Sequence, residues 1–185
     1  MIDQVLGQLE ADMKANAASL TRDFSRIRTG RANPSLLDSI HVDYYGADTP
    51  LNQLATVSAP EPKLIVVQPF DQSVINGIEK AIRSSDLGLS PVSDGKILRV
   101  PLPDLTEERR RDLVKQVRKD AERHRVSARI HRREANDMLK ELLNDKEIAE
   151  DDQHRAQDKV EELTRAAIAR IDEITKGKEA EVMSV

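Results

Sequence analysis

Arginine residues recur at a regular spacing in the middle of the chain. Four of them lie seven positions apart, and Arg129 falls between the last two: Arg111, Arg118, Arg125 and Arg132. In an α-helix with about 3.6 residues per turn, this spacing aligns all five guanidinium groups in one stripe. Because the planar guanidinium suits phosphate oxygens, the sequence predicts a surface that binds a phosphate-rich polymer.

The charge balance supports this interpretation. From Leu105 to Ala135 the chain has 11 Lys or Arg residues against 6 Asp or Glu residues, a net charge of +5. The whole chain carries −4, which leaves −9 for the remainder. A basic helix in an otherwise acidic protein is typical of a nucleic-acid-binding surface. The alternative is that these Arg residues only form the solvated face of a helix.

The sequence offers little for catalysis. It has no cysteine, no Gly-rich phosphate loop and no nucleophile elbow, and its four histidines are scattered. We therefore expect no catalytic residue, no bound metal and no cofactor. Two of the histidines, His124 and His131, fall on the predicted apolar side of the basic helix. We expect them to be packed and hydrogen-bonded between helices, with a pH-sensitive role as the alternative.

Three long helices are predicted to position the basic stripe. Apolar residues at 3–4 spacing indicate helices over 1–29, from about Thr106 to Leu143, and from Glu150 onwards, with Gly30 as the cap of the first. The buried side of the second is predicted from Val114, Val117, Ala121, His124, Ala128, His131, Ala135, Met138 and Leu142. That of the third is predicted from Val160, Leu163, Ala167, Ile171 and Ile174.

The segment between the first two helices is built differently. All eight prolines lie between Pro34 and Pro103, and proline does not continue a helix interior. The pattern predicts strands near 39–45, 53–58, 64–68 and 97–100, and one helix near 72–85 that Asp71 caps. We therefore predict an α+β protein of two domains. An antiparallel three-helix bundle (1–30 and 104–185) would carry an inserted small β/α/β domain (31–103).

Two short covalent crossings join the predicted domains. They contain Gly30, Arg31 and Ala32 on one side, and Pro101, Leu102, Pro103 and Asp104 on the other. Connections this short, with little apolar sequence, favour a two-strand hinge. We also expect a cytoplasmic monomer, because no apolar run reaches the length of a membrane span and the acidic N-terminal segment is unlike a signal peptide.

Four separated motifs resemble the bacterial ribosome recycling factor family: Ile27–Pro34, Asp43–Gly46, Ser85–Leu89 and Leu105–Arg110. The resemblance covers essentially the whole chain. It implies a three-helix bundle with an inserted β/α/β domain. It also implies a translation factor that binds the large ribosomal subunit after termination and, with elongation factor G and GTP, splits the ribosome into subunits. The partner would bind and hydrolyse the GTP.

The resemblance also implies which residues contact ribosomal RNA: Arg28, Arg31, Arg110, Arg129, Arg132 and Arg133. With the stripe, the predicted RNA-binding set further includes Arg111, Arg118 and Arg125. The chain departs from the family pattern at two positions, where Ile130 replaces an Asn and His131 replaces an apolar residue. A coiled-coil adaptor or chaperone that binds protein is the alternative function. It would bind without salt sensitivity and without preference for ribosomes.

Overall fold

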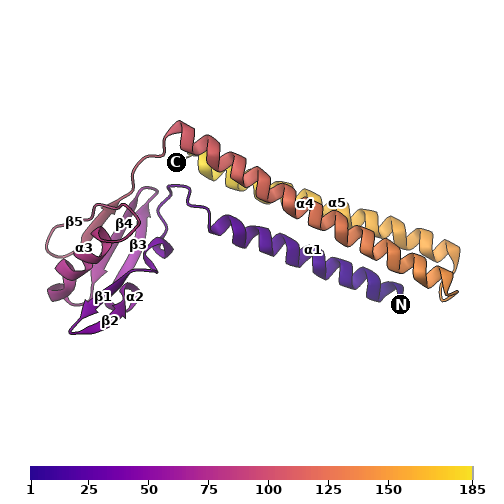
Figure 1. Ribbon diagram of the computed structural model, residues 1–185, viewed down its shortest axis with the longest axis horizontal. Coiled ribbons are helices and arrows are strands. Elements are labelled where there is room, and N and C mark those ends of the chain that lie inside the picture. Colours follow the sequence, from indigo (N-terminus) through magenta and orange to yellow (C-terminus); the bar gives the residue numbers. More distant parts are fainter. Residues whose placement is uncertain (185) are drawn as a thin grey trace. The chain divides into compact units, whose positions relative to one another are not determined.

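The computed structural model describes residues 1–184 as two compact units. One unit comprises 1–28 and 108–184, and we call it the bundle unit. The other comprises 29–107, and we call it the sheet unit. The chain enters the sheet unit after its first long helix and returns to the bundle unit at the start of its second long helix. The sheet unit is therefore an insertion between these two helices (Figure 1).

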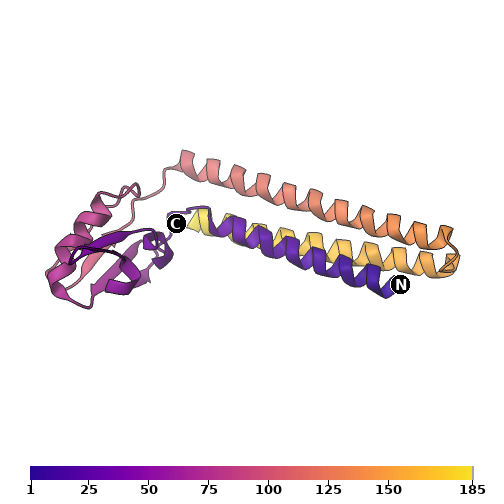
Figure 2. The same cartoon turned by 60° about the horizontal axis from the view of Figure 1, so that its bottom comes forward.

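The bundle unit contains three long helices: α1 (Ile2–Ser25), α4 (Glu107–Asn144) and α5 (Glu150–Ser184). Figure 2 shows α1 and α5 running alongside one another. The helix α4 is antiparallel to α5, to which a short turn connects it (Figure 1). Glu150, Asp151 and Asp152 occupy the first turn of α5, where their negative charges favour the helix dipole.

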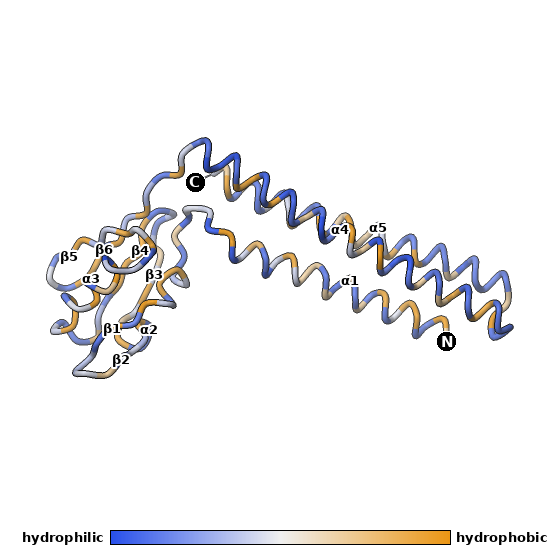
Figure 3. The backbone as a smooth tube through the Cα atoms, viewed as in Figure 1, coloured by the Kyte–Doolittle hydropathy of each residue, from blue (hydrophilic) through white to orange (hydrophobic). Residues whose placement is uncertain are grey.

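Each long helix buries a stripe of mainly apolar side chains. Figure 3 shows the corresponding alternation of hydrophobic and hydrophilic residues along the helices. In α4 the buried residues are Leu113, Val117, Ala121, His124, Ala128, Ala135 and Leu139. The predicted stripe is thus correct at five positions. It is wrong at Val114, His131, Met138 and Leu142, which are half-buried or exposed. Leu113 and Leu139 take buried places instead, because 3.6 residues per turn shift a straight helix away from a strict seven-residue repeat.

The interior of α5 is less apolar than predicted. Val160 and Ile171 are buried, but Leu163, Ala167 and Ile174 are only half-buried. The neighbouring buried positions hold Thr164 and Thr175, whose hydroxyls donate to the carbonyls of Val160 and Ile171, 2.8 and 2.7 Å away. This bonding within the helix lets a hydroxyl occupy the interior without an unpaired donor.

Helix α1 ends earlier than predicted. Its last helical residue is Ser25, and the amide of Ile27 closes the final turn on the carbonyl of Phe24 at 3.1 Å. Gly30 is therefore not the cap of α1. It adopts a left-handed backbone, with φ of +76°, and lies against Leu105. A Cβ at Gly30 would come within 2.9 Å of Leu105 Cγ, which only glycine avoids.

The sheet unit has two antiparallel sheets. The first pairs β1 (His41–Tyr44) with β2 (Ala47–Pro50) through a turn in which Tyr45 and Gly46 both have positive φ. The second has the order β3-β4-β6-β5. Its strands are β3 (Ala55–Glu61), β4 (Leu64–Pro69), β5 (Val92–Ser93) and β6 (Leu98–Pro101). The prediction missed β2 and β5. It also missed the single turn α2 (Leu51–Leu54), having begun the next strand inside it.

One helix packs into the core of the sheet unit. The 3₁₀ turn η1 (Pro34–Leu37) contributes Leu37 to this core, and a second 3₁₀ turn, η2 (Gln72–Val74), leads into α3 (Ile75–Arg83). As predicted, Asp71 caps this segment by accepting from the Ser73 amide at 2.9 Å, although the first turn is 3₁₀. Ile75, Ile78 and Ile82 of α3 are buried in the same cluster as Ile65, Val67, Leu98 and Val100 of the sheet.

Candidate nucleic-acid interface

The outer side of α4 carries unpaired basic side chains. Lys115, Lys119 and Arg133 are exposed and, by helical spacing, lie opposite the buried stripe. Within residues 1–184 none of the three makes an ion pair. The sequence prediction included Arg133 through the family resemblance but neither lysine, because Lys115 and Lys119 do not belong to the seven-residue Arg repeat. Together with Lys140, which is also exposed and makes no ion pair within residues 1–184, these residues are the cations of α4 most readily available to phosphate.

The seven-residue Arg repeat faces α5 instead. Arg118 Nε donates to Glu179 Oε1 at 2.8 Å. Arg125 donates to Asp172 Oδ1 from Nε at 2.9 Å and from Nη2 at 2.7 Å. Arg132 makes a looser contact with Glu161, at 3.8 Å. The structure thus brings three of the predicted Arg residues together in one row, but gives each a carboxylate partner on α5.

Electrostatics within this row follow from the ion pairs. Hydrogen bonding to Glu179 raises the pKa of Arg118 above its ordinary value. Burial lowers the pKa of Arg125, but hydrogen bonds with Asp172 and Glu122 outweigh it, so the net shift is upward. Hydrogen bonds from Arg129 and then Arg125 lower the pKa of the Glu122 carboxyl. All of these groups therefore stay charged at neutral pH.

The remaining predicted Arg residues differ in their surroundings. Arg129 lies 3.1 Å from Glu122 of its own helix. Arg110 is half-buried, and its Nη1 donates to the Met183 carbonyl at the end of α5, 3.4 Å away. Arg111 is exposed in the second turn of α4, and Arg28 and Arg31 are exposed at the boundary between the units. Arg28 belongs to the bundle unit and Arg31 to the sheet unit.

Two apolar side chains interrupt the basic surface. Val126 and Ile130 are 44% and 47% exposed, one helical turn apart on the outer side of α4. Ile130 therefore does not contribute to the bundle interior, and its side chain is presented among Arg129, Arg133 and Val126. His131 is half-buried and faces carboxylates of two helices, Glu134 at 3.3 Å and Asp12 of α1 at 3.9 Å.

The segments predicted as hinge are held to the sheet unit. The amide of Ala32 donates to the Pro62 carbonyl at 2.6 Å, and that of Leu102 donates to the Lys63 carbonyl at 2.8 Å. Lys63 also forms an ion pair with Asp104. Both linkers are thus tied to the same β3–β4 turn. The boundaries between the units fall just outside these contacts, after Arg28 and after Glu107.

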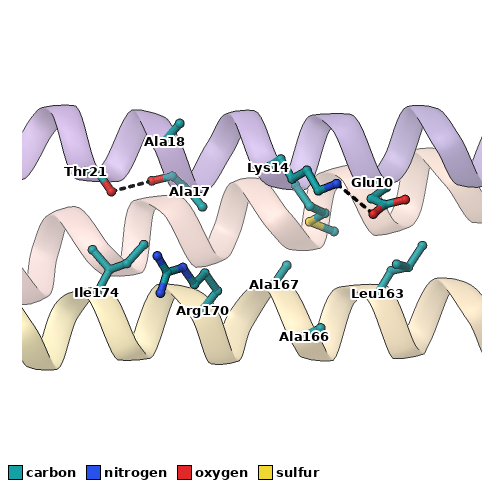
Figure 4. Close-up of a pocket in the computed structure, with 11 residues that line it drawn as sticks. Glu10, Lys14, Ala17, Ala18, Thr21, Leu163, Ala166, Ala167, Arg170 and Ile174 are labelled. Atoms are coloured by element: carbon teal, nitrogen blue, oxygen red, sulfur yellow. Dashed lines mark hydrogen bonds and ion pairs between the residues drawn. The ribbon is translucent and has the colours of Figure 1, made fainter.

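A groove of about 440 Å³ runs between α1 and α5 (Figure 4). Small side chains form much of its lining, including Ala17, Ala18, Ala166 and Ala167. Its charged groups already have partners: Lys14 pairs with Glu10 at 3.0 Å, and Arg170 pairs with Glu173 at 2.7 Å. No polar groups converge in it as a catalytic or cofactor site would require.

No cluster of His, Asp or Glu side chains within residues 1–184 has the composition of a metal site. None of the helices there is long and apolar enough to span a membrane.

The fold defines the class: an α+β protein in which a sheet unit is inserted between the first two helices of a three-helix bundle. The family model described as "Ribosome recycling factor" matches residues 20–183. Ribosome-recycling factors from Heliobacterium modesticaldum and from Geobacillus sp. (strain WCH70) are 49% and 52% identical to this chain, each over the full length of both proteins.

Solved structures of ribosome recycling factors are also similar to this chain. A solution structure of a ribosome recycling factor is similar at a TM-score of 0.72 and 41% identity, covering 100% of this chain and 98% of that one. A second similar chain has a TM-score of 0.62 and 44% identity, with 98% of both chains covered. It comes from models of the T. thermophilus ribosome recycling factor and E. coli elongation factor G bound to the E. coli post-termination complex. The chain belongs to the ribosome recycling factor family.

Proposed function

We propose that this chain binds the large ribosomal subunit after termination and, together with elongation factor G and GTP, separates the ribosome into its subunits. Membership of the family carries the proposal. The related factor on the post-termination complex, with elongation factor G present, supports the choice of both partners. Elongation factor G would hydrolyse the GTP, and this chain would act as an anchor and a lever without chemistry of its own.

The proposed anchor is the basic surface of α4. Lys115, Lys119 and Arg133 would attract the RNA backbone, because they are exposed and carry no intramolecular partner in the described residues. The proposed contact set from the sequence adds Arg28, Arg31, Arg110, Arg111, Arg118, Arg125, Arg129 and Arg132. Guanidinium and ammonium groups bind phosphate by releasing counterions, so binding should weaken steeply as salt rises. Recognition would be of backbone shape, since phosphate contacts carry no base sequence.

The proposed lever is the sheet unit. The hydrogen bonds from Ala32 and Leu102 to the β3–β4 turn support rigid linkers that move with this unit. We therefore place the points of bending at the unit boundaries, after Arg28 and after Glu107. The predicted hinge residues lie beside these boundaries, within the sheet unit. A push on the sheet unit would then be transmitted to an anchored bundle.

The test is subunit separation. Post-termination ribosomes are incubated with this chain, elongation factor G and GTP, and then sedimented through a gradient. The proposal expects free subunits only when all three components are present. Intact ribosomes in the complete reaction would contradict it. A protein-binding adaptor would associate in a salt-insensitive way and would leave the ribosomes intact.

A further inference from the structure

Two carboxylates of α5 are placed in register with the Arg repeat of α4. Asp172 and Glu179 lie seven residues apart, as do Arg125 and Arg118, and the helices run antiparallel. Each acid therefore meets one Arg, at 2.7 Å for Asp172 and 2.8 Å for Glu179. The repeat that predicts a phosphate-binding stripe is thus matched by a second repeat of opposite charge.

The Arg118–Glu179 pair contributes little to holding the bundle together. The Arg118 side chain is 68% exposed in spite of its contact with Glu179. Ion pairs at exposed positions stabilise proteins by about 0–1 kcal/mol, because solvent screens them and the side chains lose freedom. Stability therefore gives only a weak reason for Glu179 beside a surface that we propose binds a polyanion. The Arg125 side chain is only 24% exposed, so the Arg125–Asp172 pair also contributes to packing.

The two acids have a larger effect on the attraction of an approaching polyanion than on the stability of the bundle. A carboxylate about 3 Å from a guanidinium cancels most of its field at the distance from which RNA is first attracted. At close range the guanidinium still has unused N–H groups, because it carries five and Glu179 takes the Nε–H of Arg118. Arg118 and Arg125 thus attract RNA weakly from afar. Arg118 can still donate to a phosphate placed correctly beside it, whereas each nitrogen of Arg125 already donates to Asp172 or Glu122.

We propose that Asp172 and Glu179 are specificity-determining residues for RNA binding by α4. They suppress attraction to arbitrary RNA and hold Arg118 and Arg125 in fixed directions for phosphates of matching position. Long-range attraction is left to the unpaired row of Lys115, Lys119 and Arg133. The inference rests on the proposed function, since it assumes that α4 binds ribosomal RNA.

The test compares two double variants with equal loss of charge. Asp172→Asn/Glu179→Gln removes the acids that face the Arg repeat. The control, Glu162→Gln/Glu173→Gln, removes two exposed acids of the same helix that pair with Lys159 and Arg170 of α5 itself, at 2.9 and 2.7 Å. Far-UV circular dichroism establishes that both variants are folded. Affinity is then measured for random-sequence RNA and for purified large subunits over a range of salt concentrations.

We expect the first variant to bind random RNA several-fold more tightly than the control, with a log–log salt slope steeper by about 1, because Arg118 loses its acid whereas Arg125 keeps Glu122 at 3.2 Å. Its preference for large subunits over random RNA should fall. An equal or smaller gain than in the control would overturn the inference, because net charge alone would then explain it. If the unmodified chain showed no preference for large subunits, the proposed function would fail first.

Discussion

A buried histidine joins α4 to α1, and its removal should weaken the bundle. His124 Nδ1 lies 2.7 Å from Asn16 Oδ1, and Nε2 lies 2.9 Å from Asp23 Oδ2. The Asn16 amide is oriented by its other end, since Nδ2 donates to the His124 carbonyl at 2.8 Å. Both ring nitrogens therefore lie within hydrogen-bond distance of a side-chain oxygen of α1.

The magnitude for His124→Ala follows from these contacts. The variant leaves the buried Asn16 Oδ1 without a donor, which costs about 1–3 kcal/mol. It also removes a charge-assisted hydrogen bond to Asp23, worth about 1.5–3 kcal/mol in general. Asp23 is partly exposed and keeps Arg123 at 3.1 Å, so this loss falls at the low end. We expect the free energy of unfolding to fall by about 2–4 kcal/mol.

The assay is urea denaturation followed by far-UV circular dichroism, which reports chiefly on the long helices. His154→Ala is the matched control, because His154 is exposed on α5 and only 3.9 Å contact with Glu150 is lost. Surface substitutions of this kind change stability by about 0.5 kcal/mol or less. Hydrogen exchange of the α1 amides should accelerate in His124→Ala alone. A loss no larger than that of the control would refute the proposed role of the network.

The same network gives a signed pH dependence. The hydrogen bond from His124 is the main cause that lowers the pKa of Asp23 below its ordinary 3.8. A carboxyl whose pKa is lowered on folding contributes stability above 3.8 and loses it as the pH falls towards the lowered folded value. Acid unfolding of the parent should therefore steepen below this pH, and His124→Ala should show a smaller acid-dependent loss.

Three further predictions concern other positions. Gly177→Ala, in α5 with open space around the added Cβ, should stabilise by about 1 kcal/mol in thermal unfolding, because alanine favours a helix more than glycine. Gly30→Ala should destabilise by about 1–2 kcal/mol in the same assay, from its left-handed backbone alone, with crowding of Leu105 adding to this. NMR titration of Asp94 should give a pKa of about 2, held down by the amides of Ile97 and Lys96, so its contribution to stability should disappear between about pH 4 and 2.

The sequence predicted the helices well because periodic burial is a local property. The start of α5 at Glu150 was predicted correctly. The strand β2 was missed since it contains Pro50 and pairs with β1 at an edge, where alternation is weak. The strand β5 has only two residues, which is too short for any pattern.

The sequence did not show which neighbouring helix the Arg stripe faces. Spacing within α4 groups Arg118 with Arg125, but which neighbour they face depends on tertiary packing. A signal did exist, because Asp172 and Glu179 repeat the same interval on the last helix. Charges that flank a helix interface commonly pair in this way. Lys115 and Lys119 can be recognised as exposed cations without an ion pair in residues 1–184 only from the tertiary structure, in which Arg118, Arg125 and Arg132 contact acids of α5.

The central claim is that the outer side of α4 anchors the chain to the large subunit. It is tested most directly by co-sedimentation of Arg133→Glu with purified large subunits. Arg22→Glu on α1 is the matched control, since both residues are exposed and neither makes an ion pair within residues 1–184. The account predicts that Arg133→Glu, like Arg132→Glu, loses binding while remaining folded, and that Arg22→Glu binds as the parent does. Undiminished co-sedimentation of Arg133→Glu would contradict it.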